Sequence, residues 1–299
     1  MTTSIWTTNI SMANTASLRA WGSELNSQFV SVGLVQTADT GQVNWSTVNL
    51  PIGNTLIGYE IWRFNDAMQA SYPIYIRLAY YTAATVTNSY IATIQIGTST
   101  DGAGNLTGYT TTAVTFSRQA VGSAGNAFAS TTLPYASYLC CTAGFLGLVH
   151  KQDCLGTALP ATSAFIVQRT VDASGAPNGE GVMVIYNNQT SGGIPASATC
   201  LSFVYSGAIF GGNNSFTWIP FNVTSSLYSG GAQVFKSYGL FPRMRTMFGF
   251  GSCLIAEYGR GTQFQATLVG TTPRNYICVG ANFFATTSSA ANYNFMLWE

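Results

Sequence analysis

Apolar residues recur along the chain with two different periods, and the helical period appears at the beginning. Across residues 11–30, Leu18, Trp21, Leu25 and Phe29 repeat at intervals of three and four positions. This spacing predicts one amphipathic helix with a single apolar stripe. The stripe could pack on the sheet of its own subunit or against a neighbouring copy, and the spacing does not distinguish between them.

The second period is that of β-strands, in short runs rich in β-branched and aromatic residues. Alternation is clearest at residues 74–78, 94–96 and 182–186, where one face carries the larger aliphatic side chains. Gly- and Asn-containing segments separate the runs, and Asp101–Asn105 is predicted to be a hairpin loop. The expected strands are 29–36, 56–64, 74–81, 90–97, 109–118, 165–171, 182–187, 199–206, 217–222, 253–258, 264–269 and 276–281.

Many short strands without alternating helices predict a mainly β fold. We expect an antiparallel, jelly-roll-like β-sandwich with one N-terminal amphipathic helix. Residues 1–36 are interpreted as a helix-plus-strand attachment element, and residues 37–299 as the β-sandwich body. A Gly/Ser/Ala-rich stretch at 121–129 could divide that body into two similar sub-sandwiches, although one composite domain is preferred.

Charged residues are scarce in this chain. They make up 7% of its 299 residues, against roughly 25% in an average soluble domain, while the net charge is +1. With so little repulsion between copies, self-association is expected. Nucleic-acid binding is not expected, because no basic cluster is denser than Arg243-Met-Arg245. Membrane insertion is not expected either, because no uninterrupted apolar run reaches about 18 residues.

The six cysteines are predicted to be reduced thiols, buried as small apolar side chains. None of them stands in a CxxC or Cys/His spacing typical of zinc sites. They are Cys140, Cys141, Cys154, Cys200, Cys253 and Cys278.

The strongest catalytic-looking cluster is the segment His150-Lys-Gln-Asp153-Cys154, which joins a base, an acid and a thiol. It is interpreted instead as a polar loop, because a catalytic Cys and His normally converge from distant segments. The ten acidic residues show no paired spacing suited to glycoside hydrolysis. No phosphate- or dinucleotide-binding motif occurs. We therefore predict no enzymatic activity, no catalytic residue, no metal site and no cofactor.

Several segments of the first 110 residues resemble virion structural proteins of tailed bacteriophages. The resemblance rests on Leu18–Gly22, Val32–Trp45, Gly58–Asp66, Pro73–Arg77 and Gly97–Gly108. It implies a repeated, non-enzymatic building block of a virion, such as a tail fibre, capsid-associated or appendage protein. It also implies assembly in the host cytoplasm with other virion proteins. The rest of the chain carries no equally specific motif.

The expected function is therefore structural, with self-association into a trimer or hexamer. The predicted subunit interface is formed by Trp21, Leu25 and Phe29. Under this hypothesis, deletion of residues 1–36 releases folded monomers. The alternative function is a receptor- or glycan-binding module of a tail fibre, in which exposed aromatic residues contact a host surface glycan.

Overall fold

The computed structural model describes thirteen segments of the chain, and all structural statements below concern them. They are residues 2–8, 15–49, 55–82, 90–119, 135–151, 162–171, 176–188, 197–204, 234–236, 250–253, 261–266, 273–281 and 293–299. These segments contain one α-helix, α1 (Thr15–Ser31), a short 3₁₀ helix, η1 (Ala67–Gln69), and antiparallel strands.

The strands form two large sheets that share a core. Sheet B has the order β2-β3-β4-β5-β8 and sheet A the order β1-β9-β10-β11-β12-β13. The strands of sheet B are β2 (Val35–Gln36), β3 (Leu56–Arg63), β4 (Tyr75–Thr82), β5 (Tyr90–Gly97) and β8 (Val114–Gln119). Those of sheet A are β1 (Thr3–Thr8), β9 (Tyr135–Thr142), β10 (Phe145–Lys151), β11 (Thr162–Val171), β12 (Pro177–Asn188) and β13 (Ser197–Val204).

Two further sheets complete the described structure. Sheet C is the hairpin of β6 (Ser99–Thr100) and β7 (Leu106–Thr107), which confirms the predicted loop at Asp101–Asn105. Sheet D has the order β14-β15-β18-β17-β16. Its strands are β14 (Val234–Lys236), β15 (Phe250–Cys253), β16 (Gln263–Ala266), β17 (Arg274–Ala281) and β18 (Tyr293–Leu297).

The expected mainly β, antiparallel architecture with one N-terminal helix is confirmed, and its connectivity is simpler than that of a jelly roll. Strands β9 to β13 follow one another across sheet A, as β2 to β5 do across sheet B. A jelly roll would instead pass the chain repeatedly from one sheet to the other. Strands that are consecutive in the chain are therefore mostly neighbours, and each of these two sheets is largely a meander.

One continuous apolar core lies between sheets A and B. Leu78 and Ile94 of sheet B belong to the same buried cluster as Leu148 and Phe165 of sheet A. The rings of Phe116 and Phe165 meet edge to face across the two sheets, with centroids 5.0 Å apart. The residues 121–129 lie outside the described segments. They connect sheet B to sheet A, and the shared core favours one composite domain over two sub-sandwiches.

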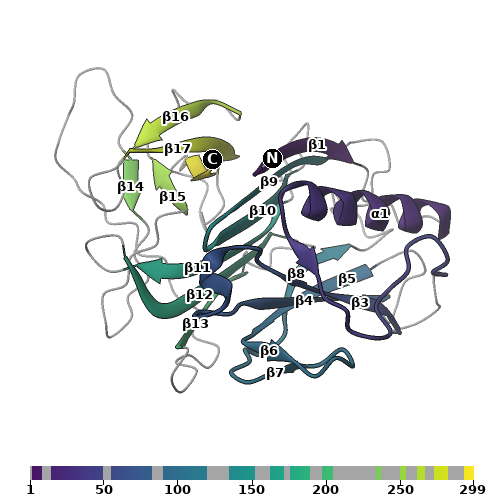
Figure 1. Cartoon of the computed structure of the whole chain (residues 1–299). Helices are drawn as coiled ribbons and strands as arrows, with labels where there is room; N and C mark the ends of the chain where they lie inside the picture. Colours follow the sequence, from purple (N-terminus) through teal and green to yellow (C-terminus); the bar gives the residue numbers. More distant parts are fainter. Residues whose placement is uncertain are drawn as a thin grey trace.

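Residues 1–36 are part of this domain. Figure 1 shows α1 beside β1 and over the strands of sheet B, while β1 extends sheet A and β2 extends sheet B. The helix runs through Phe29–Ser31, where a strand was expected, because Phe29 continues the apolar stripe that begins at Leu18. The interpretation of this segment as a separate attachment element is therefore corrected.

Sheet D covers part of the outer face of sheet A. A Cβ atom placed on Gly147 of β10 would lie 2.4 Å from the Sδ atom of Met296 in β18, so glycine permits this close approach. Trp298 meets Tyr138 of β9 with ring centroids 6.4 Å apart. The two ends of the chain lie close together (Figure 1), and the hydroxyl of Thr2 donates to the carbonyl oxygen of Glu299.

Candidate functional site

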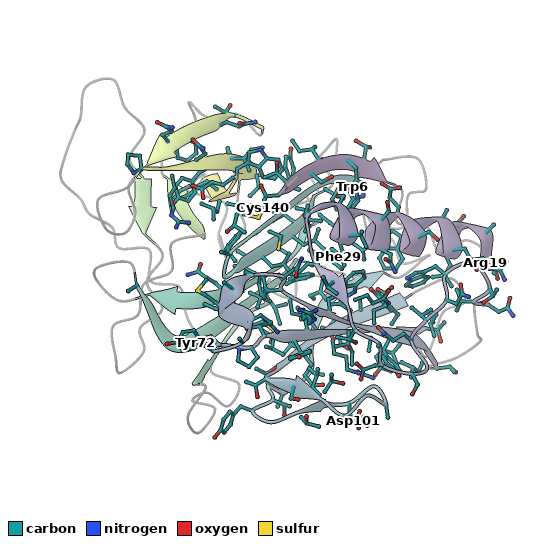
Figure 2. All side chains as sticks on the ribbon, in the orientation of Figure 1. Trp6, Arg19, Phe29, Tyr72, Asp101 and Cys140 are labelled. Carbon is teal, nitrogen blue, oxygen red and sulfur yellow. The ribbon has the colours of Figure 1, made fainter. Side chains whose placement is uncertain are left out.

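The three predicted interface residues lie inside the subunit. Trp21, Leu25 and Phe29 are 3%, 2% and 1% exposed, and all three belong to the core between the helix and the sheets. Phe29 meets Trp62 of β3 edge to face, with ring centroids 5.2 Å apart, and Figure 2 shows Phe29 between the helix and the strands. The stripe packs on its own subunit, so the predicted interface at these residues is corrected.

A buried carboxyl group anchors the helix to sheet B. Glu60 of β3 is 0% exposed. Its Oε1 accepts bonds from Asn26 Nδ2 and Trp45 Nε1, both 2.8 Å long, and its Oε2 accepts one of 2.9 Å from the Tyr80 hydroxyl. Burial raises the pKa of Glu60, while these three donors act in the opposite direction. The group links the helix, β3 and β4 through neutral partners.

His150 lies in β10, in the middle of sheet A, rather than in the polar loop that was expected. The sheet register places it between Ser137 of β9 and Ser163 of β11. All three side chains are buried, and Ser137 Oγ lies 2.7 Å from His150 Nδ1. Strand β10 was missed because its residues 145–149 are almost continuously apolar, without the alternation that marks a half-buried strand.

This serine–histidine pair lacks the features of a nucleophile site. Ser137 is 0% exposed, and His150 Nε2 is buried without a hydrogen-bond partner in the described part of the chain. Burial is the only cause that lowers the pKa of His150, to about 4, so no described carboxylate orients the ring. The ring packs edge to face on Trp6, with centroids 5.9 Å apart. Asp153 and Cys154 lie outside the described segments.

Three of the predicted thiols are buried and unbridged, as expected. Cys140, Cys141 and Cys278 are free and buried. Burial raises the pKa of both Cys140 and Cys141 to about 12, so these thiols stay protonated and are poor nucleophiles. Cys154 lies outside the described segments, and the side chains of Cys200 and Cys253 are not described.

A buried ion pair joins sheet A to the turn that follows β3. Arg169 of β11 is 2% exposed, and its Nη1 lies 2.6 Å from Asp66 Oδ2. The guanidinium also donates to the Tyr72 carbonyl oxygen at 2.8 Å and to Gln69 Oε1 at 3.0 Å. Its carbon Cζ stands 4.9 Å from the centroid of the Phe64 ring. This geometry holds the two sheets in register at one end of the core.

The carboxylates of Asp39, in the loop after β2, and of Asp101, in the hairpin β6–β7, also bind groups within the chain. Asp39 accepts hydrogen bonds from the hydroxyls of Thr37 and Thr100 and from the Gly104 N–H. Burial and the nearby Asp101 carboxylate act to raise the pKa of Asp39, but the three hydrogen bonds together lower it. Asp101, at the tip of the hairpin in Figure 2, accepts bonds from the N–H groups of Ala103 and Asn105 and from the Asn105 side chain. Both carboxylates therefore shape the loop.

Most of the described charged side chains form hydrogen bonds or ion pairs within the chain. Among the charged residues whose exposure the structure describes, Asp101 and Glu299 are exposed, and the side chain of Arg274 is 38% exposed beside Glu299. Arg19 donates to the carbonyl oxygens of Thr47 and Val48, and Arg77 donates to that of Gly104. The described surface is consequently built mainly from uncharged side chains.

Comparisons of the chain with protein-family models, with curated proteins and with solved structures found no match. Within the described residues there is no group of three metal-ligating side chains and no helix of a length and hydropathy that could span a bilayer.

Strand β1 is the surface feature that the sequence analysis missed. Among the described strands it pairs with β9 alone, and it lies at the outer edge of sheet A. The signal was present in the β-branched and aromatic composition of Thr-Ser-Ile-Trp-Thr-Thr. A run of six residues next to the stronger helical pattern was not recognised as a strand.

Proposed function

We propose that this chain is a non-enzymatic structural subunit of a tailed-bacteriophage virion that acts by assembling with copies of itself and with other virion proteins. The observation that carries the proposal is that most of the described charged side chains make their contacts within the subunit. Arg169, Asp66 and Glu60 serve contacts within the subunit, while the exposed charged groups among the described residues are those of Asp101, Arg274 and Glu299. A surface with so few charges offers little repulsion between copies.

The polar groups of the interior support the same proposal. The serine–histidine pair of sheet A and the Glu60 carboxyl group are buried, and their described hydrogen bonds are made within the subunit. They hold the fold in register rather than face a substrate. The sequence resemblance to tailed-phage virion proteins is the reason for proposing that the assembly is a virion.

The proposal is tested by the composition of particles. Virions from a host culture that produces this chain are banded by density and analysed by quantitative mass spectrometry. The chain is expected in the banded fraction at many copies per particle. Its absence from that fraction, while it remains present in the lysate, would contradict the proposal.

A receptor-binding role is the alternative, and it has less support in the described residues. Tyr109, 39% exposed, is the one aromatic side chain among their large exposed hydrophobic residues, whereas a sugar platform generally needs several exposed rings. Saturable binding of the purified chain to host cells, abolished by free host glycan, would favour this alternative.

A further inference from the structure

Strand β1 has one hydrogen-bonding side that is used and one that is open. The Cys141 N–H donates to the Thr2 carbonyl oxygen at 2.8 Å, which fixes the phase of the ladder between β1 and β9. Because antiparallel bonding alternates, Ser4 and Trp6 direct their backbone groups to β9. Thr3, Ile5 and Thr7 therefore direct their N–H and C=O groups away from sheet A.

Nothing in the described part of the chain pairs with that outer side. β1 is the terminal strand of sheet A, and α1 lies on its inner face, where the Ser4 hydroxyl donates to Gln28 Oε1. Soluble proteins usually protect such an edge with a lysine, a proline, a bulge or an inward-pointing charge. β1 has none of these features, and Ile5 is 53% exposed.

The outer face of β1 is also symmetric about Ile5. Thr3, Ile5 and Thr7 present threonine, isoleucine and threonine in either direction along the strand. An antiparallel twofold pairing needs a surface that is complementary to itself. A strand without charges satisfies this condition, because no like charges come together across the axis.

We propose that β1 pairs with β1 of a second copy of this chain, antiparallel, about a twofold axis at Ile5. Ile5 then faces the partner's Ile5, and Thr3 faces the partner's Thr7. The outward N–H and C=O groups form hydrogen bonds across the axis, and sheet A continues into the second subunit as one sheet. Threonine and isoleucine pairs of this kind stabilise antiparallel strands.

This inference rests on the proposed assembly function and specifies the symmetry of the contact between copies. A twofold contact is incompatible with a plain threefold trimer but occurs in a dimer and in a hexamer of dihedral symmetry. It also replaces the predicted interface at the helix by one that is formed by residues on the surface.

The first test removes the outward hydrogen-bond donor. Ile5→Pro deletes an N–H group that has no partner in the described subunit, and proline is tolerated at the open side of an edge strand. Sedimentation velocity over a concentration series is expected to show an even-numbered oligomer for the wild type and half its mass or less for Ile5→Pro. Ile5→Val, which keeps both the N–H group and the β-branch, is the matched control and should behave as the wild type.

The second test uses charge and does not depend on proline. Ile5→Glu and Ile5→Lys each place like charges across the axis, so each variant alone is expected to dissociate. An equimolar mixture should recover a species that contains one copy of each, which native mass spectrometry separates by mass.

A wild type that is monomeric at every concentration would overturn the inference, as would an oligomer that all these variants leave intact. The second result would mean that the copies assemble through a surface other than β1. The proposed virion function is judged separately, by the presence of the chain in banded particles.

Discussion

At one end of the core Arg169 is 2% exposed and is held by Asp66, Gln69 and the Tyr72 carbonyl oxygen, whereas at the edge of sheet A Ile5 is 53% exposed. The outward backbone groups of Ile5 have no partner in the described subunit. The Arg169 site combines charge and hydrogen bonds, while the outward side of β1 carries no charge and has no strand paired with it in the described subunit. The proposed assembly accounts for this difference: the few charges define the subunit, and an uncharged strand is left for the proposed contact between copies.

The largest effect is expected from breaking the ion pair between Arg169 and Asp66. Arg169→Met leaves the Asp66 carboxylate with the Gly144 N–H, 3.0 Å away, and without its cation. Removal of one partner of a buried pair typically costs roughly 3–5 kcal/mol. We expect a loss of that order in the free energy of unfolding, measured by urea denaturation.

Arg63 provides the matched control for this prediction. It is half-buried, and its described hydrogen bond is one of 3.3 Å from Nη1 to the Phe64 carbonyl oxygen. Arg63→Met should therefore cost about 1 kcal/mol or less. Equal losses in the two variants would contradict the special role of the Arg169 pair.

The next effect concerns pH. Burial lowers the pKa of His150 from 6.5 to about 4, so the unfolded chain binds a proton in this range before the folded chain does. The corresponding stability is fully present above pH 6.5 and is lost as the pH falls towards 4. The expected loss is about 3 kcal/mol over this window.

His150→Gln should remove that part of the pH dependence. The free energy of unfolding is measured by urea denaturation at several pH values for both proteins. The two proteins are compared by the slope of this free energy against pH, because the substitution itself can shift stability equally at every pH. A variant that keeps the wild-type slope between pH 4 and 6.5 would show that His150 is accessible to protons in the folded state.

A smaller effect is expected at the contact between the helix and Trp45. A Cβ atom on Gly22 would lie 2.1 Å from the Trp45 ring. Alanine is the better helix former by about 1 kcal/mol, yet overpacking typically costs roughly 1–3 kcal/mol. Gly22→Ala should therefore lower the melting temperature, whereas Ser23→Ala, at an exposed neighbouring position, should leave it unchanged or raise it. A higher melting temperature in both variants would contradict the close packing of Gly22 on Trp45.

Local patterns in the sequence predicted much of the fold. The helical stripe and strand β5 were predicted from periodicity alone, because a half-buried element repeats its apolar side chains at the period of its backbone. The hairpin β9–β10 was missed because both of its faces are buried, one by the core and the other by sheet D, so alternation is lost.

The candidate site could not be predicted from the same signals. Periodicity showed that Trp21, Leu25 and Phe29 form an apolar stripe, but it could not decide whether the same chain or another covers it. That decision depends on β3 and β4, which bring Trp62 and Tyr80 against the helix from distant positions. The open edge of β1 likewise follows from the order of strands in sheet A, which no local pattern specifies.

The most direct test of this account compares the wild type and Ile5→Pro by sedimentation velocity, together with urea unfolding of each. We predict that the substitution dissociates the oligomer while it changes the unfolding free energy of the subunit by less than about 1 kcal/mol, because the lost N–H has no partner within it. An oligomer that survives with a folded subunit would contradict the role of β1 as the contact between copies.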